Sequence, residues 1–199
     1  MVSEMKVSKI QASDNRDAIV KAAAGQLREH GFDQMSITAV AQAAGLTHGA
    51  LYSHFKSKDT LKAAATQRAF EECIHSFGEL APPQFFDRYL SAAHREHPEQ
   101  GCPGAALVSE VPGQPTLSKE AFRKGIQDFI ALTRSKLGAA EGEGTADKAI
   151  FVFAAMVGGL ALSRAVRDVD QPGADGILHA VSTELKHFIT PAKRARKRQ

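Results

Sequence analysis

Residues 36–58, SITAVAQAAGLTHGALYSHFKSK, constrain the fold of this chain more than any other stretch. Ser36 is a favourable N-cap, and apolar residues follow it at three- and four-residue spacing, which predicts a short helix with one apolar side. Gly45 ends that helix, because glycine adopts a positive φ without a Cβ clash and lets the chain turn sharply. Thr47 then caps a second helix that runs through Phe55. The stretch therefore predicts two short helices joined by a tight turn.

The second of these helices has two distinct sides. Leu51 and Phe55, with Leu46 just before them, can face inward. The positions left for solvent or a partner are His48, Gly49, Ala50, Tyr52, Ser53 and His54. A helix of this size fits the major groove of DNA. The same pattern also suits an ordinary helical hairpin with polar outer positions.

The run from Asp17 to Leu61 resembles the N-terminal domain of TetR-family transcriptional regulators. The resemblance depends on the joint order and spacing of several features over about 45 residues, none of them diagnostic alone. These features are Gly31-Phe32 at the end of the first helix, Thr38 early in the second, Ala41, Gly45 at the turn, Leu51-Tyr52, His54-Phe55 and Lys58. The resemblance implies a sequence-specific DNA-binding regulator, most simply a repressor that an inducer releases from its operator.

Composition supports an all-α fold, within which the resemblance implies an N-terminal helix-turn-helix domain. Helix formers abound in the 199 residues, strand formers are few, and the formal net charge is only +3. The tail, residues 191–199, holds five basic residues and no acid, which leaves 20 basic against 22 acidic residues elsewhere. Because phosphate binding depends on local positive charge, this balance does not exclude DNA binding. We expect a DNA-binding domain over 1–57, a ligand-binding and dimerisation domain over 58–190, and the basic tail.

The chain carries no pattern that points to export or to a membrane. It has no N-terminal apolar core suited to a signal peptide, and its longest apolar run, residues 149–162, is shorter than the roughly 20 residues that span a bilayer. Cys73 and Cys102 make no disulfide framework, and a reducing compartment would keep both as thiols. We therefore expect a soluble cytoplasmic protein.

Helical periodicity predicts about nine helices in all. A mobile arm over residues 1–12 precedes the first helix, which starts at Ser13 or Asp14 and ends at Gly31. Ser57 is expected to cap a long fourth helix, a fifth helix covers residues 83–97, and EGEGT near residue 141 reads as a flexible loop.

The last two helices cover residues 146–167 and a segment with Ile177 to Phe188 on one side. Gly158-Gly159 in the first of them is costly in a helix interior, which suggests close approach of another helix. In the resembled family such a pair packs against its two-fold mate, so we expect a homodimer. The alternative is that both helices are buried in the core of one chain.

The resemblance implies phosphate contacts through Thr38, Tyr52, His54 and Lys58. Base contacts would come from the start of the recognition helix, at Thr47, His48, Gly49 and Ala50. Glycine and alanine let the backbone approach closely but form no bidentate hydrogen bond, so specificity would rest on few direct contacts and on DNA shape. The recognition helices of two copies must lie about 34–36 Å apart to bind a palindromic operator, which makes dimerisation part of the mechanism.

The larger domain is expected to bind a small-molecule inducer, apolar or aromatic in character. Candidate lining residues are Phe86, Tyr89, Cys102, Leu107, Phe122, Phe129, Phe151 and Met156. Each of them is also compatible with plain core packing. Cys102 precedes Pro103 at the start of a helix, and some TetR relatives with a Gly-Cys there sense electrophiles or oxidants, so a reactive thiol is a further hypothesis.

Two other function classes compete with this interpretation. A helical-bundle enzyme would need a metal or nucleophile motif, and the sequence holds neither, so we expect no enzyme activity, no cofactor and no metal. His94 and His97 lack a third ligand at suitable spacing and read as solvent-exposed. A nonspecific nucleic-acid-binding protein driven by the basic tail would lose most of its affinity without residues 191–199.

Overall fold

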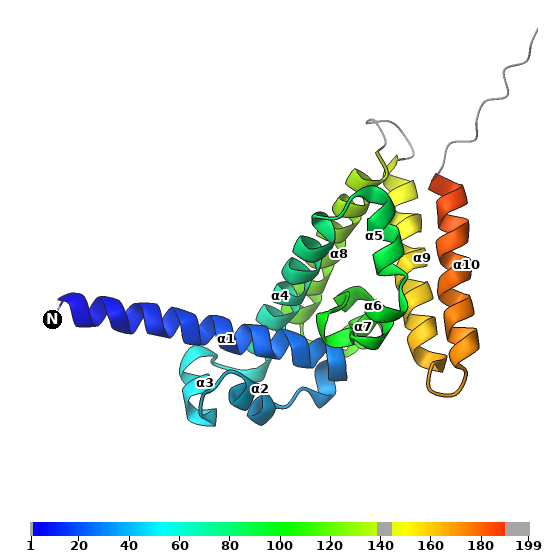
Figure 1. Cartoon of the computed structure of the whole chain (residues 1–199). Coiled ribbons are helices and arrows are strands. Elements are labelled where there is room, and N and C mark those ends of the chain that lie inside the picture. The colour runs from blue at the N-terminus through cyan, green and yellow to red at the C-terminus, as the bar shows by residue number, and fades with distance from the viewer. Residues whose placement is uncertain (1, 139–144, 190–199) are drawn as a thin grey trace, which may run out of the picture.

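The computed structural model describes residues 2–138 and 145–189, and this part contains α-helices and short 3-10 helices but no strand (Figure 1). The α-helices are α1 (Val2–Gln34), α2 (Ile37–Ala43), α3 (His48–His54), α4 (Lys58–Gly78), α5 (Pro82–Tyr89), α6 (Ala92–Glu96), α7 (Pro103–Leu107), α8 (Thr116–Lys136), α9 (Thr145–Val166) and α10 (Gln171–Ile189). The 3-10 helices are η1 (Pro98–Gln100) and η2 (Val111–Gly113). The all-α class is confirmed, with one α-helix more than expected. The basic tail and most of the EGEGT loop lie outside the described residues.

The first helix is longer than the sequence suggested. Its backbone is helical from Val2, so the expected arm over residues 1–12 was wrong. Apolar periodicity reveals only a helix that buries one face, and the start of α1 projects beyond the rest of the molecule (Figure 1). At the other end Gly31 leaves the helical conformation with φ 81°, as its position predicted, and a last turn continues to Gln34.

The expected single helix over residues 83–97 is two helices. α5 ends at Tyr89, Leu90 leaves the helical region, and Ser91 caps α6 by accepting a hydrogen bond from the His94 N–H at 3.1 Å. The apolar spacing hid this N-cap, because Ser91 falls at a polar position of the continuous pattern. The break changes the direction of the chain between α5 and α6 and brings the His94 ring to the Tyr89 carbonyl.

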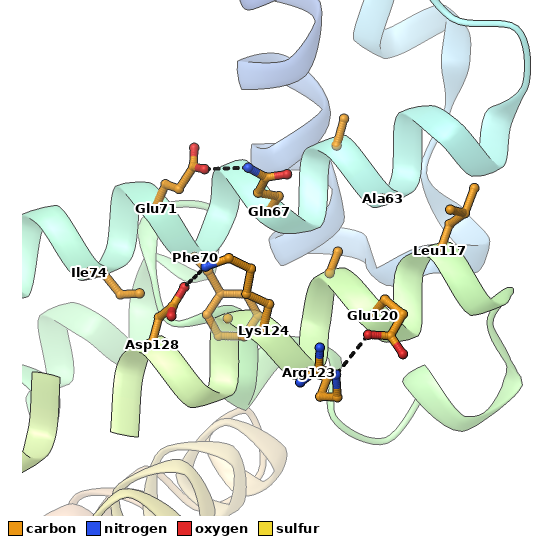
Figure 2. A pocket seen from close by; sticks show the side chains of 13 residues that line it. Ala63, Gln67, Phe70, Glu71, Ile74, Leu117, Glu120, Arg123, Lys124 and Asp128 are labelled. Atoms are coloured by element: carbon orange, nitrogen blue, oxygen red, sulfur yellow. Dashed lines mark hydrogen bonds and ion pairs between the residues drawn. The ribbon is translucent and has the colours of Figure 1, made fainter. Parts of the chain in front are cut away.

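α4 connects the two halves of the molecule, since it packs both on α1, with ion pairs from Arg68 and Glu72, and on α8. Its N-terminus carries the capping box expected at Ser57, with Thr60 as the reciprocal partner. Gly125 of α8 faces Phe70 of α4 so closely that an added Cβ would lie 2.7 Å from Phe70 Cε2 (Figure 2). The two helices therefore meet at a glycine that no larger residue could replace without displacing the ring.

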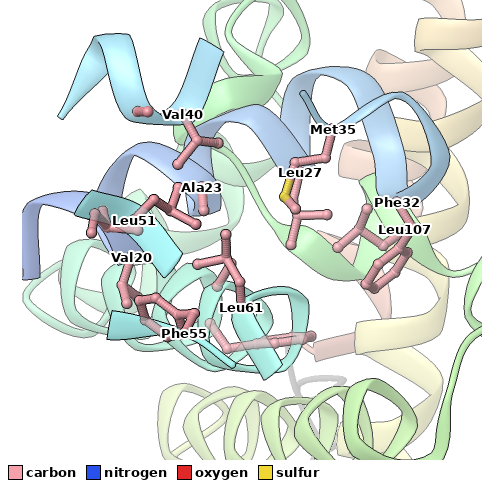
Figure 3. Close-up of a cluster of buried hydrophobic side chains, with 14 of the residues drawn as sticks. Val20, Ala23, Leu27, Phe32, Met35, Val40, Leu51, Phe55, Leu61 and Leu107 are labelled. Carbon is pink, nitrogen blue, oxygen red and sulfur yellow. The ribbon is translucent and has the colours of Figure 1, made fainter. Parts of the chain in front are cut away.

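The N-terminal core unites the first three helices with the start of α4 (Figure 3). The side chains that fill it, each at most 7% exposed, include Ile19, Val20, Ala23 and Leu27 of α1, Val40 of α2, Leu51 of α3, Phe55 and Leu61. The first helix thus packs in one core with Val40, Leu51 and Phe55. Phe32, Met35 and Leu107 extend the same cluster toward α7.

α9 and α10 lie antiparallel along one side of the larger domain (Figure 1). α9 has 22 residues and a mean hydropathy of 2.0 over its most apolar 18-residue window, of which 39% is buried within the chain. By length and composition alone it could cross a membrane, which the count over residues 149–162 did not suggest. Within the chain it packs against both α8 and α10.

Candidate DNA-binding interface and sensor site

α3 presents the residues expected to contact DNA on its outer side. Thr47 caps the helix, with Oγ1 accepting from the Ala50 N–H at 3.2 Å, while Leu51 is buried beneath it. The side chains of Thr47, His48 and Tyr52 and the Gly49 backbone are exposed, and Ala50 and His54 are half-buried. The two-sided pattern of the recognition helix is thus confirmed.

The outermost feature of α3 is a ring pair. His48 and Tyr52, one turn apart, meet edge to face with 5.2 Å between ring centroids and 60° between planes. The contact limits the rotamers of both side chains before any partner binds. Ser53, which the sequence left available, donates its hydroxyl to the Ala50 carbonyl at 2.6 Å. Its hydrogen is therefore engaged within the helix.

The two glycines of this region have different reasons to be glycine. Gly45 adopts φ 70°, as the tight turn required. Gly49 has an ordinary helical backbone, and an added Cβ there would meet nothing within 4 Å. Packing inside the chain therefore does not require glycine at position 49, and its open surroundings leave room for the backbone of another molecule.

Thr38 and Lys58 flank α3 on either side. Thr38 is exposed on α2, and Lys58 is half-buried in the first turn of α4. The Ser57–Thr60 capping box already satisfies two backbone N–H groups of that turn, with Thr60 N to Ser57 Oγ at 3.2 Å and Ser57 N to Thr60 Oγ1 at 3.3 Å. A phosphate at this helix end would therefore depend more on the Lys58 ammonium than on free backbone donors.

Arg16 is a cation that sequence reasoning overlooked. Its guanidinium carbon lies 4.9 Å from the centroid of the Phe55 ring, directly after α3, and the residue is exposed. It stands on α1 three and four positions before the buried Ile19 and Val20, so its place at the edge of the inward face was a usable signal. Arg16 adds positive charge beside the recognition helix.

A cluster of polar groups is buried where α4, α5, α6 and α7 meet. Cys73 of α4 and Cys102 before α7 are both free, buried thiols. Burial raises the pKa of Cys102, but the neighbouring Cys73 thiol, the nearby Tyr89 hydroxyl and the N–H groups of Ala105 and Gly104 outweigh it and lower that pKa to about 7. Burial and the neighbouring Cys102 sulfur raise the pKa of Cys73 well above its ordinary value. The pair therefore has one acidic thiol and one that stays protonated.

His94 binds the backbone of Cys102. Its Nε2 accepts the Cys102 N–H at 2.9 Å, and its Nδ1 lies 2.7 Å from the Tyr89 carbonyl, which it meets as the protonated nitrogen. Burial lowers the pKa of His94 to about 4. The expectation of a solvent-exposed His94 was wrong, and within the described residues no group of three His, Cys, Asp or Glu side chains is placed to hold a metal.

Two arginines fasten α6 to the last two helices. Arg95, 1% exposed, donates from Nη1 to Ser163 Oγ at 3.2 Å and to Asp175 Oδ1 at 2.7 Å. Arg164 donates from Nη2 to the His94 carbonyl at 2.7 Å. A buried guanidinium needs this many acceptors to offset its desolvation, so the contacts fix α6 in place.

The structure does not bring the eight expected ligand-lining residues together. Those in the core of the larger domain are Phe86, Tyr89, Cys102, Phe129 and Met156. Leu107 and Phe122 belong to the N-terminal core instead. Phe151 lies on the outer side of α9, 54% exposed, with its ring 4.9 Å from that of Phe188.

Hollows near the surface involve mostly other residues. A groove of about 440 Å³ runs between α4 and α8 over Phe70, and its rim is charged (Figure 2). The rim charges are paired on their own helix, Arg123 with Glu120 and Lys124 with Asp128. A second hollow, of about 370 Å³, lies on the outer side of α9 and α10 and is lined by Phe151, Ala155, Ala180, Val181, Glu184, Leu185 and Phe188.

Comparison with known proteins agrees with the geometry of the N-terminal domain. Residues 19–65 match the family model of bacterial regulatory proteins of the tetR family. The HTH-type transcriptional repressor BepR of Brucella suis biovar 1 (strain 1330) is 41% identical over 54 residues, which are 27% of this chain and 26% of BepR. The match therefore spans about a quarter of the relative's length.

Solved structures extend the likeness to nearly the whole chain. Reduced E. coli NemR superposes with a TM-score of 0.70 at 19% identity, over 87% of this chain and 96% of that one. A TetR-family regulator from Cytophaga hutchinsonii gives a TM-score of 0.72 at 18% identity, over 92% of this chain and 98% of that one. Identities this low establish the fold alone. Residues 19–65 thus carry the N-terminal domain of the tetR family of bacterial regulatory proteins, and the chain as a whole has the fold of the solved regulators to which it is similar.

Proposed function

We propose that the protein is a sequence-specific DNA-binding transcriptional regulator of the cytoplasm, in its simplest form a repressor that a small apolar or aromatic inducer releases from its operator. The observation that carries the proposal is α3, which is capped by Thr47 and exposes His48, Gly49 and Tyr52 above a buried core. The curated relative that matches this domain is itself described as a transcriptional repressor.

The α3 geometry divides the work between base and phosphate contacts. Thr47 and His48 offer hydrogen-bonding groups to base edges, and Gly49 and Ala50 let the helix approach and contact a thymine methyl group. Phosphate oxygens would be bound from around the helix by Thr38, Tyr52, His54 and Lys58. Few direct base contacts are available, so DNA shape would contribute to specificity.

A homodimer is the assembly that fits the outer side of α9 and α10. Phe151, Ala155, Gly158 and Leu162 recur at four-, three- and four-residue spacing along α9, and Phe151 and Leu162 are 54% and 60% exposed. An exposed apolar stripe of this length normally marks an interface. A second copy is the occupant we favour, because two readers at about 34–36 Å are needed for successive major-groove faces of a palindrome.

Selection of duplexes from a random-sequence pool by the full-length protein tests the proposal. We expect enrichment of a palindromic site, retained in excess random competitor at about 0.15 M salt. A chain lacking residues 191–199 should enrich the same site with lower overall affinity. If neither protein enriched a site, an operator-reading function would be excluded. If removal of residues 191–199 abolished all DNA binding, the nonspecific alternative would be favoured.

The thiol cluster favours a second candidate function, release from DNA on oxidation or alkylation of Cys102. The observation behind it is a pair of free, buried thiols, Cys102 at the start of α7 and Cys73 of α4, whose surroundings lower the pKa of Cys102. A lowered pKa favours the thiolate of Cys102, which is the reactive form. Because Cys102 is fully buried, a reagent would reach it only when α6 and α7 separate.

A further inference from the structure

The α1–α2 junction, residues 31–36, is held from the larger domain by one carboxylate. Glu110, between α7 and η2, accepts the Phe32 N–H on Oε2 at 2.7 Å. The same carboxylate lies against Gly31, where an added Cβ would stand 2.7 Å from Glu110 Cδ. Gly31 therefore serves two purposes, a backbone with φ 81° and space for the Glu110 side chain.

The segment that holds Glu110, residues 107–114, makes two further contacts with the N-terminal core and the start of α4. Leu107, fully buried, belongs to the N-terminal core together with Phe32 (Figure 3). Gln114 accepts a hydrogen bond from Lys62 Nζ of α4 at 3.1 Å, with both side chains buried, and that ammonium lies 5.7 Å from the centre of the Phe32 ring. Residues 107–114 thus reach the junction directly through Glu110 and Leu107 and, by way of Lys62, through Gln114.

The other end of this segment is the thiol cluster. Cys102 is the N-cap of α7, and only α7 and one turn separate it from Glu110. A short helix transmits displacement of one end to the other because its backbone hydrogen bonds keep its length fixed. A change at Cys102 therefore reaches the Phe32 N–H with few flexible bonds between them.

We propose that Glu110 is a positioning residue for DNA reading: its carboxylate, bonded to the Phe32 N–H against Gly31, sets the angle between the α2–α3 unit and the larger domain. Glu110 touches no DNA in this scheme and acts through the α1–α2 junction. The inference rests on the proposed regulator function, since it assigns a means of regulating that same site.

The test compares Glu110→Ala and Glu110→Gln with the full-length wild type. Glutamine keeps an oxygen that can accept the Phe32 N–H, and alanine does not. Glu120→Ala is the matched control, because Glu120 is an exposed glutamate that pairs with Arg123 on its own helix. Thermal melts confirm that each variant folds, and titration with the duplex selected by the wild type measures operator affinity.

Loss of a hydrogen bond to a charged acceptor should weaken operator binding by about tenfold in Glu110→Ala. Glu110→Gln and Glu120→Ala should bind within a factor of about three of the wild type, less than the 1.4 kcal/mol of a tenfold change. Wild-type affinity in Glu110→Ala, or equal losses in Glu110→Gln and Glu110→Ala, would overturn the proposal.

A distance measurement separates this inference from the function on which it rests. Spin labels at exposed Gln42→Cys on α2 and Ser135→Cys on α8 report the angle of the α2–α3 unit within one chain. Glu110→Ala should shift or broaden their distance distribution, and Glu110→Gln should leave it unchanged. An unchanged distribution in Glu110→Ala contradicts the positioning role even if the wild type selects an operator. A wild type that selects no duplex contradicts the proposed function alone.

Discussion

A Cβ added to Gly159 would stand 3.0 Å from Cγ2 of Val181, so α9 and α10 approach each other more closely than a side chain at position 159 would normally allow. Gly159→Leu should therefore lower the free energy of unfolding by about 1–3 kcal/mol through overpacking. Gly176→Ala is the control, because a Cβ there meets nothing within 4 Å, and it should raise that free energy by at most about 1 kcal/mol. Urea denaturation of both variants checks the packing; equal stability in the two would show that the helices lie further apart.

The outer stripe of α9 should govern assembly. Leu162→Glu places a charge in the proposed interface and should convert a dimer to monomers without loss of helicity, as measured by sedimentation velocity and circular dichroism. Leu117→Glu on α8 is the matched control, since Leu117 is 55% exposed and Leu162 60%. If both variants stayed dimeric, the interface would lie elsewhere.

Lys58 should act on phosphate and not on sequence. Lys58→Ala is expected to weaken binding to operator and random duplex by a similar factor and to reduce the slope of log affinity against log salt by about 1. Lys119→Ala, an exposed lysine of α8, should change neither quantity. A loss confined to the operator would instead give Lys58 a base contact.

The lowered pKa of His94 makes stability depend on pH in a defined direction. An unfolded histidine takes up a proton near pH 6.5, and folded His94 only near pH 4, so between these values the unfolded chain binds more protons. The contribution of this group is fully present above pH 6.5 and is lost as the pH falls, to a total of about 3 kcal/mol.

Replacement of His94 isolates this effect from the carboxylates. The difference in unfolding free energy between wild type and His94→Gln, measured in urea from pH 7 to pH 4, should shrink as the pH falls, because only the wild type pays for the buried imidazole. A difference that stayed constant over this range would show that His94 titrates normally.

Cys102 should be required for any redox response. Release of operator DNA by quinones or hypochlorite is expected in the wild type and should be absent in Cys102→Ser, as measured by fluorescence anisotropy. Cys73→Ser retains the acidic thiol and serves as the comparison. Unchanged release in Cys102→Ser would remove the sensing hypothesis.

The sequence predicted best what local chemistry decides. Ser36, Thr47 and Ser57 were expected as caps and each accepts the backbone N–H three residues on. Gly31 and Gly45 were expected at helix ends and both have positive φ. Caps and helix-ending glycines depend only on residues close in sequence. The N-terminal domain and its exposed recognition helix could therefore be inferred without a structure.

Long-range contacts escaped prediction. The sequence offered a solvent-exposed His94, but the fold buries it between Tyr89 and Cys102, which the α5–α6 break makes possible. Gly158 and Gly159 looked equivalent, yet only Gly159 meets α10, while Gly158 faces open space. Aromatic composition alone could not tell that Phe151 lies at the surface and Phe129 in the core, because both suit either place.

The buried guanidinium of Arg95 has a consequence for how a signal would travel. Through Ser163 and Asp175 it ties α6 to the helices on which a second copy would sit. In the proposed dimer, the stretch from His97 to Pro115 would therefore be anchored at its α6 end, near the partner, and freer at the end that contacts the α1–α2 junction. Strain created along this stretch would be relieved at the end near the α1–α2 junction. The distance between the two recognition helices would then change while the proposed dimer stayed assembled.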